Sequence, residues 1–235
     1  MTHALVTWTA MAALTGAAGA AAEPRPAVVE LFTSQGCSSC PPADALLGEL
    51  AARSDVLALA YHVDYWDELG WRDRFELPQA VQRQSEYVRR LRLASLYTPQ
   101  MVIDGRDDVL GSDRVRVMQL LTRPRPAVPL AVAVRSGALV VEAGAVPGAA
   151  SCDVLVLSFL PEAVTAIGRG ENSGRTLREF NIVRSVRTLG TWRATAAAWR
   201  ISIDSLPVDA SFVAVLLQDR LTGSIVAAAK LPLPR

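Results

Sequence analysis

Two cysteines separated by two serines are the clearest chemical feature of this 235-residue sequence. Cys37 and Cys40 follow an apolar run that ends near Thr33, and Pro41 then opens a segment with helical periodicity. The start of a helix offers free N–H groups and partial positive charge, which favour a thiolate at the first cysteine. We therefore predict thiol–disulfide exchange, in which Cys37 attacks and Cys40 resolves the mixed disulfide.

The same two cysteines support two other interpretations. In an oxidising compartment, a Cys37–Cys40 disulfide can serve only to staple its loop, and the chain would then be a non-catalytic binding protein. Cys37, Cys40 and His62 also offer two thiolates and one imidazole, a ligand set that suits copper, and the chain would then be a copper carrier. For the oxidoreductase we expect no metal and no other cofactor.

Polar and aromatic residues follow a second apolar run, Val56–Val63. Sites in open α/β sheets form beyond the carboxyl ends of the strands, so we expect Asp64 near the cysteines. Asp64 is a candidate to exchange a proton with Cys40, which requires that burial raise its pKa. The alternative is that Asp64 caps the next turn while Trp66 packs in a flap. Trp66 is also a candidate for contact with a bound substrate.

The spacing of apolar residues predicts seven elements over residues 27–123, in the order βαβαββα. The first three, a strand, a helix and a strand, imply a parallel strand pair with a right-handed crossover. Residues 100–104 and 107–110 flank an Asp104-Gly105 turn and are expected to form a hairpin. This half of the chain therefore has an α/β pattern.

Residues 124–129 contain three prolines and mark a predicted linker between two domains. From residue 130 to residue 235 the sequence offers short strands with no helix between them, including Asp153–Leu160 and Phe180–Val186, which is typical of a β-sandwich. Gly168–Arg175 is rich in glycine and polar residues. It is either a partner-binding or interdomain loop, or an ordinary hairpin tip.

The N-terminus has the pattern of a secretory signal. Residues 1–22 are mainly apolar and contain no Lys, Arg, Asp or Glu, and Ala20 and Ala22 supply the small residues of a cleavage site. We predict a signal peptide over residues 1–22 and a periplasmic or secreted protein. Later apolar runs are too short to span a bilayer, so no stable membrane insertion is expected after signal removal. The net charge of +1 gives no indication of nucleic-acid binding.

The order strand, Cys-x-x-Cys, helix, strand, helix, Thr98-Pro99 and hairpin resembles the thioredoxin fold. That resemblance implies that Pro99 is cis and lies against the cysteines, and that the backbone of Thr98 pairs with a bound peptide. Four separated motifs also resemble a family of secreted bacterial proteins with a thioredoxin-like domain of unknown function. These motifs are residues 30–44, residues 62–67, residues 97–100, and residues 170–172 together with 181–184.

Together these observations predict an α/β thioredoxin-like domain (βαβαββα) over residues 27–123, followed by an all-β sandwich domain over residues 130–235. The expected function is an exported thiol–disulfide oxidoreductase that acts on thiols or disulfides of exported proteins and is served by a redox partner protein. Its predicted catalytic residues are Cys37, Cys40, Pro99 and Asp64, and its predicted substrate-binding residues are Thr98 and Trp66.

Overall fold

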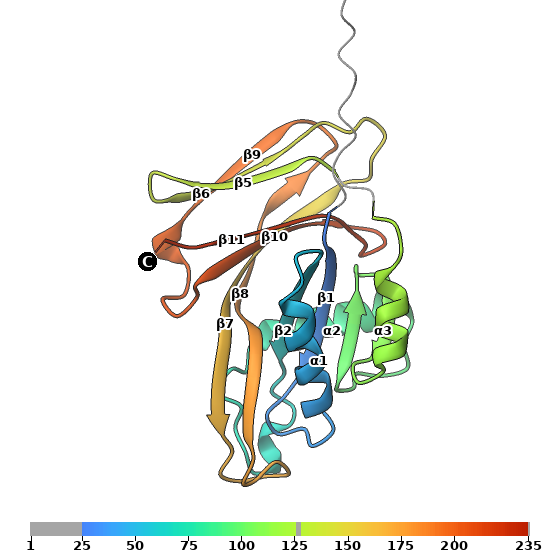
Figure 1. Cartoon of the computed structure of the whole chain (residues 1–235). Coiled ribbons are helices and arrows are strands. Elements are labelled where there is room, and N and C mark those ends of the chain that lie inside the picture. The colour runs from blue at the N-terminus through green and yellow to red at the C-terminus, as the bar shows by residue number, and fades with distance from the viewer. Residues whose placement is uncertain (1–24, 126–127, 235) are drawn as a thin grey trace, which may run out of the picture.

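The computed structural model describes residues 25–125 and 128–234 of the chain (Figure 1). The predicted signal peptide, residues 1–22, lies outside this part, and so do residues 126–127 of the predicted linker. Strands account for 42% of the structure and helices for 19%, so the protein is mainly β. No helix in the described part is both long and apolar enough to cross a membrane.

The first half of the described chain has its helices and strands in the order expected from the sequence. Its two central strands are buried along their whole length because helices cover both faces of the sheet there. The elements are β1 (Ala27–Thr33), α1 (Pro41–Ala51), β2 (Val56–His62), a 3₁₀ turn η1 (Asp67–Leu69), α2 (Pro78–Leu91), β3 (Gln100–Ile103), β4 (Asp107–Leu110) and α3 (Arg114–Leu121).

The second half consists of strands joined by turns and one further 3₁₀ turn. Two of its strands, of 15 and 17 residues, are about twice as long as the sequence predicts. The elements are β5 (Leu130–Arg135), β6 (Ala138–Ala143), β7 (Cys152–Ala166), β8 (Thr176–Trp192), β9 (Ala197–Ser202), η2 (Ile203–Ser205), β10 (Phe212–Asp219) and β11 (Ile225–Pro232).

The strands form one mixed sheet in the order β11-β10-β7-β8-β2-β1-β3-β4 and a small sheet in the order β5-β6-β9. The predicted fold class, a thioredoxin-like α/β domain followed by a separate β-sandwich, is therefore wrong. The two halves share the large sheet because β8 pairs in parallel with β2, with Ala60 opposite Ile182. The side-chain amide of Asn181 strengthens this junction by donating to the carbonyl oxygen of Ala58, 2.9 Å away.

Three apolar cores show how the layers pack. On one face of the large sheet, α2 contributes Ala80 and Tyr87, and its N-cap residue contributes Leu77, to a core that extends from β3 to β11. On the other face, α1 and α3 cover β1, β2 and β3, while the small sheet covers β7, β10 and β11. Figure 1 shows the long β7–β8 hairpin running from the small sheet down past β2. The far end of this hairpin thus reaches the region of the cysteines.

Candidate functional site

A disulfide joins Cys37 and Cys40, whose Cα atoms lie 5.4 Å apart. Cys40 is the N-cap residue of α1, and its carbonyl oxygen accepts hydrogen bonds from the N–H groups of Ala43 and Asp44, 2.9 and 3.1 Å away. The helix therefore begins at the second cysteine, with prolines in its first turn. Both cysteines are 0% exposed, so the disulfide is closed off from solvent in this conformation.

The Thr98-Pro99 peptide bond is cis, as the resemblance to the thioredoxin fold implies. Pro99 is buried, and its carbonyl oxygen accepts a hydrogen bond from the N–H of Gly111, 2.9 Å away. A Cβ atom added to Gly111 would lie 3.1 Å from Cβ of Pro99 and 3.0 Å from Cβ of Ala43. Pro99 therefore lies beside the first turn of α1, the turn that Cys40 opens.

Trp66 connects the two segments that flank this turn. Its indole N–H donates to the hydroxyl of Thr98, 2.9 Å away, and a Cβ atom added to Gly36 would lie 3.0 Å from Cβ of Trp66. The structure thus brings the two predicted substrate-binding residues together. Trp66 therefore lies against both Gly36, the residue before Cys37, and Thr98, the residue before the cis-proline.

The buried carboxyl group nearest to the cysteines in sequence belongs to Asp44, whereas Asp64 is exposed. Asp44 lies one helical turn after Cys40 and accepts a hydrogen bond from the hydroxyl of Thr33, 2.8 Å away. Burial raises the pKa of Asp44 to about 7, and the positive charge of His62 opposes that rise only in part. The burial and raised pKa that proton exchange with Cys40 requires are therefore found at Asp44.

His62 is buried next to two further carboxylates. Its Nδ1 lies 2.7 Å from Asp73 Oδ2 and 3.8 Å from Glu179 Oε1. Burial acts to lower the pKa of His62, but the negative charges of Asp73, Glu179 and Asp44 outweigh it and raise that pKa to about 9. The described residues contain no group of three or more His, Cys, Asp and Glu side chains suited to a metal ion.

The far end of the β7–β8 hairpin, residues 167–175 and hereafter the β7–β8 tip, covers the cysteine loop. The side-chain amide of Asn172 donates to the carbonyl oxygens of Gln35 and Cys37, both 2.9 Å away. The carboxylate of Glu171 accepts from the N–H of Ser38 at 3.2 Å. Asn172 is 0% exposed. Residues 168–175, predicted as either a contact loop or a plain hairpin tip, thus form a hairpin tip that also contacts the first half of the chain.

Gln35 links the cysteine loop to β8 and to the loop between η1 and α2. Its N–H donates to Asp73 Oδ2 at 2.8 Å, and its side-chain amide donates to Glu179 Oε2 at 2.9 Å. Its side-chain carbonyl accepts from the indole of Trp71 at 3.0 Å. Sequence reasoning missed Gln35, Asp44, Asp73 and Glu179. Only Asp44 had a local signal, because a residue four positions after Cys40 in a helix lies on the same side as Cys40.

Comparison with known proteins places these features in a family. The family described as "Protein of unknown function (DUF1223)" matches residues 28–218. The chain belongs to this family. The match to DUF1223 includes both cysteines, the cis-proline and the β7–β8 tip, so the whole candidate site lies within the matched range. No curated protein matches the chain.

Two solved structures are similar to this DUF1223 protein. The crystal structure of protein AGR_C_4864 from Agrobacterium tumefaciens is 33% identical, with a TM-score of 0.75, and the match covers 89% of this chain and 95% of that one. HBP35 of Porphyromonas gingivalis is 14% identical, with a TM-score of 0.57, and the match covers 89% of this chain and 76% of that one. The second likeness shows the fold alone.

Proposed function

We propose that the chain carries out thiol–disulfide exchange through Cys37 and Cys40, with cysteines of other exported proteins as its substrates. This role is supported above all by the position of the disulfide at the start of α1, where cis-Pro99 lies against the same turn. The hydrogen bond from Trp66 to Thr98 fixes the residue whose backbone would pair with a substrate peptide. Export rests on the leader predicted over residues 1–22.

The exchange proceeds in two steps that balance in atoms and electrons. A substrate thiolate attacks Sγ of Cys37, the Cys37–Cys40 bond breaks, and Cys40 leaves as a thiolate that takes a proton from the carboxyl group of Asp44. A second substrate thiolate then attacks the mixed disulfide and releases Cys37. The two substrate thiols give their protons to solvent when they become thiolates, and the released Cys37 thiolate takes a proton from solvent. The substrate thus loses two electrons and gains a disulfide, and the two cysteines become thiols. Run backwards, the same steps reduce a substrate disulfide.

Asp44 suits the proton step because a pKa of about 7 leaves its carboxyl group about half protonated at neutral pH. An ordinary exposed aspartate, with a pKa near 3.9, would hold almost no proton there. Asp44 is a proton donor and acceptor in this scheme, while Cys37 and Cys40 form and break the covalent bonds.

Exchange also requires that the β7–β8 tip move aside, because both cysteines are 0% exposed under it. Three hydrogen bonds hold the tip to the cysteine loop, two from Asn172 and one to Glu171. At about 1 kcal/mol net for each, local opening costs only a few kcal/mol and does not require global unfolding. The structure then corresponds to a closed, oxidised form.

Two measurements test the exchange function. Equilibration with glutathione buffers should give a midpoint potential above about −300 mV, the range of catalytic rather than structural disulfides. Incubation with a disulfide-bonded test protein should also yield a mixed disulfide, because the Cys37 thiolate attacks the substrate disulfide and releases one substrate thiolate. This mixed disulfide should accumulate in Cys40→Ser, which lacks the resolving thiol, and be absent in Cys37→Ser. A midpoint well below that range together with no trapped mixed disulfide would refute catalysis.

The full burial of both cysteines favours a second candidate, a disulfide that only staples its loop in a binding protein. For a closed loop of four residues, the chain-entropy relation gives a stabilisation of about 2 kcal/mol. The staple therefore predicts that the double variant Cys37→Ser/Cys40→Ser loses about this much unfolding free energy. It also predicts that no partner is trapped by Cys40→Ser.

A further inference from the structure

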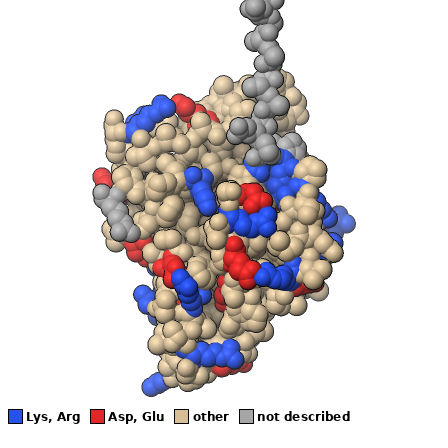
Figure 2. All heavy atoms as spheres, viewed as in Figure 1, with Lys and Arg blue, Asp and Glu red and all other residues tan. Residues whose placement is uncertain are grey.

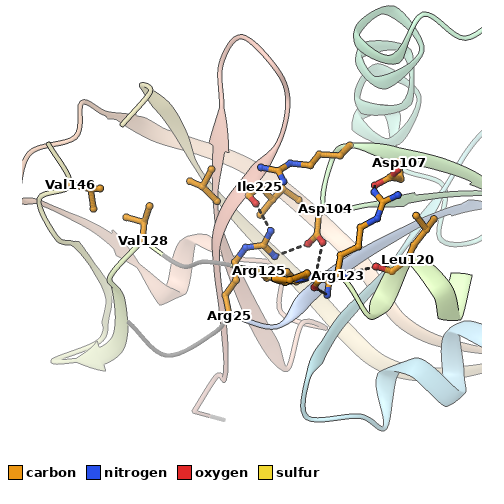
Figure 3. Close-up of a pocket in the computed structure, with 12 residues that line it drawn as sticks. Arg25, Asp104, Asp107, Leu120, Arg123, Arg125, Val128, Val146 and Ile225 are labelled. Atoms are coloured by element: carbon orange, nitrogen blue, oxygen red, sulfur yellow. Dashed lines mark hydrogen bonds and ion pairs between the residues drawn. The ribbon is translucent and has the colours of Figure 1, made fainter. Parts of the chain in front are cut away.

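A pocket of about 480 Å³ lies where the end of α3 meets the β3–β4 turn and the start of β11 (Figure 3). It is far from the cysteines, because the N–H of Val28 near the start of β1 binds Asp104 in the pocket wall, whereas Cys37 follows the other end of β1. The seven-residue strand β1 separates the two ends by about 20 Å. The pocket is thus a site separate from the proposed exchange centre.

The charged wall of the pocket carries an excess of positive charge. Asp104 is shared between two buried guanidinium groups, with Oδ1 2.6 Å from Arg25 Nη1 and Oδ2 2.6 Å from Arg125 Nε. Asp107 pairs with Arg123. Arg106 also lines the pocket, is exposed, and has no ion-pair partner among residues 25–125 and 128–234. Four arginines and two aspartates leave a formal charge of +2.

One buried donor in this wall is also unsatisfied. The two terminal nitrogens of Arg25 donate to Asp104, to the carbonyl oxygen of Pro26 and to that of Ile225, but its Nε is buried and has no hydrogen-bond partner among the described residues. Figure 2 shows basic side chains gathered on the upper right of the molecule with acidic ones among them.

The other end of the pocket is apolar. Val128, Val146 and Val226 line it, and Figure 3 shows Val128 and Val146 on the side away from Asp107 and Arg123. The volume lies within the range of small-molecule sites, about 300 to 1,000 Å³. The planar guanidinium fork matches the oxygens of a carboxylate or a phosphate, and the valines match a short hydrocarbon.

We propose that this pocket binds a small amphipathic anion. Its carboxylate or phosphate headgroup lies against Arg106 and Arg123, and its short apolar body lies against Val128, Val146 and Val226. Such a ligand neutralises part of the excess charge and covers the valines at the same time. A neutral molecule of the same size covers the valines but does not neutralise the charge. A bare anion neutralises charge but leaves the valines uncovered.

Calorimetric titration of the full chain, purified from an exporting host, with octanoate and octyl phosphate tests this assignment. Both should bind at least tenfold more tightly than acetate, and 1-octanol should bind at least tenfold more weakly than octanoate. A parallel assay with phosphatidylglycerol vesicles distinguishes a free ligand from a lipid headgroup. Retention on the vesicles assigns the headgroup to a membrane lipid, and its absence assigns it to a soluble molecule.

Two variants locate the ligand. Arg106→Gln should weaken octanoate binding by about tenfold, since it removes one charge-assisted hydrogen bond, while the matched control Arg200→Gln on β9 should leave it unchanged. Val146→Ser should reduce the preference for octanoate over acetate. Both positions are at least partly exposed, so melting curves should confirm that the variants fold. Octanoate that binds no better than acetate, or binding that neither variant weakens, would overturn the proposal.

Discussion

The Asn172→Ala variant offers a direct test of whether the β7–β8 tip closes off the disulfide. Asn172 is completely buried and its amide supplies two hydrogen bonds, to the carbonyl oxygens of Gln35 and Cys37. At about 1 kcal/mol net for each bond, the closed form loses about 2 kcal/mol relative to the open form. Because about 1.4 kcal/mol corresponds to a factor of ten, the open population rises about 30-fold.

The assay is the rate at which dithiothreitol reduces the Cys37–Cys40 disulfide, followed by alkylation of the released thiols. The reduction rate of Asn172→Ala should exceed that of the unaltered chain by about 30-fold, since exchange through local opening is proportional to the open population. Ser173→Ala is the matched control. Its hydroxyl donates only to Gly168 within the tip, so its reduction rate should change less than threefold.

Urea unfolding of the same variant separates local opening from general destabilisation. If Asn172→Ala lowers the global stability yet reduces no faster than the unaltered chain, the tip does not control access and the reasoning above is wrong. This test applies to a catalytic and a structural disulfide alike, because it measures only whether the sulfurs become accessible.

Three further predictions concern the residues around the cysteines. Folding raises the pKa of Asp44 from about 3.8 to about 7, so the folded state binds more protons than the unfolded state between these pH values. The free energy of unfolding therefore falls by up to about 4 kcal/mol as the pH rises through this window. Asp44→Asn should abolish this fall in urea unfolding and flatten the pH profile of exchange near 7. The raised pKa of His62 acts with the same sign in a higher pH window: its contribution to stability is fully present below about 6.5 and is lost as pH rises through about 9, so His62→Gln should remove the loss of stability between those values. Gly111→Ala should cost about 1 to 3 kcal/mol in urea unfolding because the added methyl group would press on Ala43 and Pro99, and an unchanged unfolding midpoint would contradict that packing.

The local elements around the cysteines could be predicted because their signals are local. The apolar run of β1, the prolines that open α1 and the Asp104-Gly105 turn between β3 and β4 each occupy a single short window, and the structure gives those elements nearly the expected bounds. The cis-proline followed from the resemblance to a known fold rather than from the residues themselves.

The fold class could not be predicted because it depends on a pairing between distant segments. Ile182 and Val183 indicate a buried strand, but nothing near them shows that the neighbouring strand is β2. The polar residues Arg178 and Glu179 also made β8 look shorter than its 17 residues. Glu179 is in fact buried, where Gln35 donates a hydrogen bond to it.

The candidate site was predicted only in part, because several of its residues also come from segments that are distant in the sequence. Cys37 and Cys40 are close in sequence and were found together. Asp64 was chosen because it follows a strand, yet it faces solvent, and the buried acids come from α1, the η1–α2 loop and β8. Residues from such distant segments acquire a common role only when the sheet brings them together.

The parallel pairing of β2 with β8 has a consequence for how the chain is made. Ala60 and its partner Ile182 are 122 positions apart, so at 5 to 20 residues per second the ribosome needs roughly 6 to 24 s to supply the second strand after the first. During that delay the edge of β2 carries free N–H and C=O groups that can pair with any other extended chain. The nascent polypeptide is thus exposed to aggregation for many seconds, and a chaperone that keeps it unfolded until its release from the ribosome would reduce this risk.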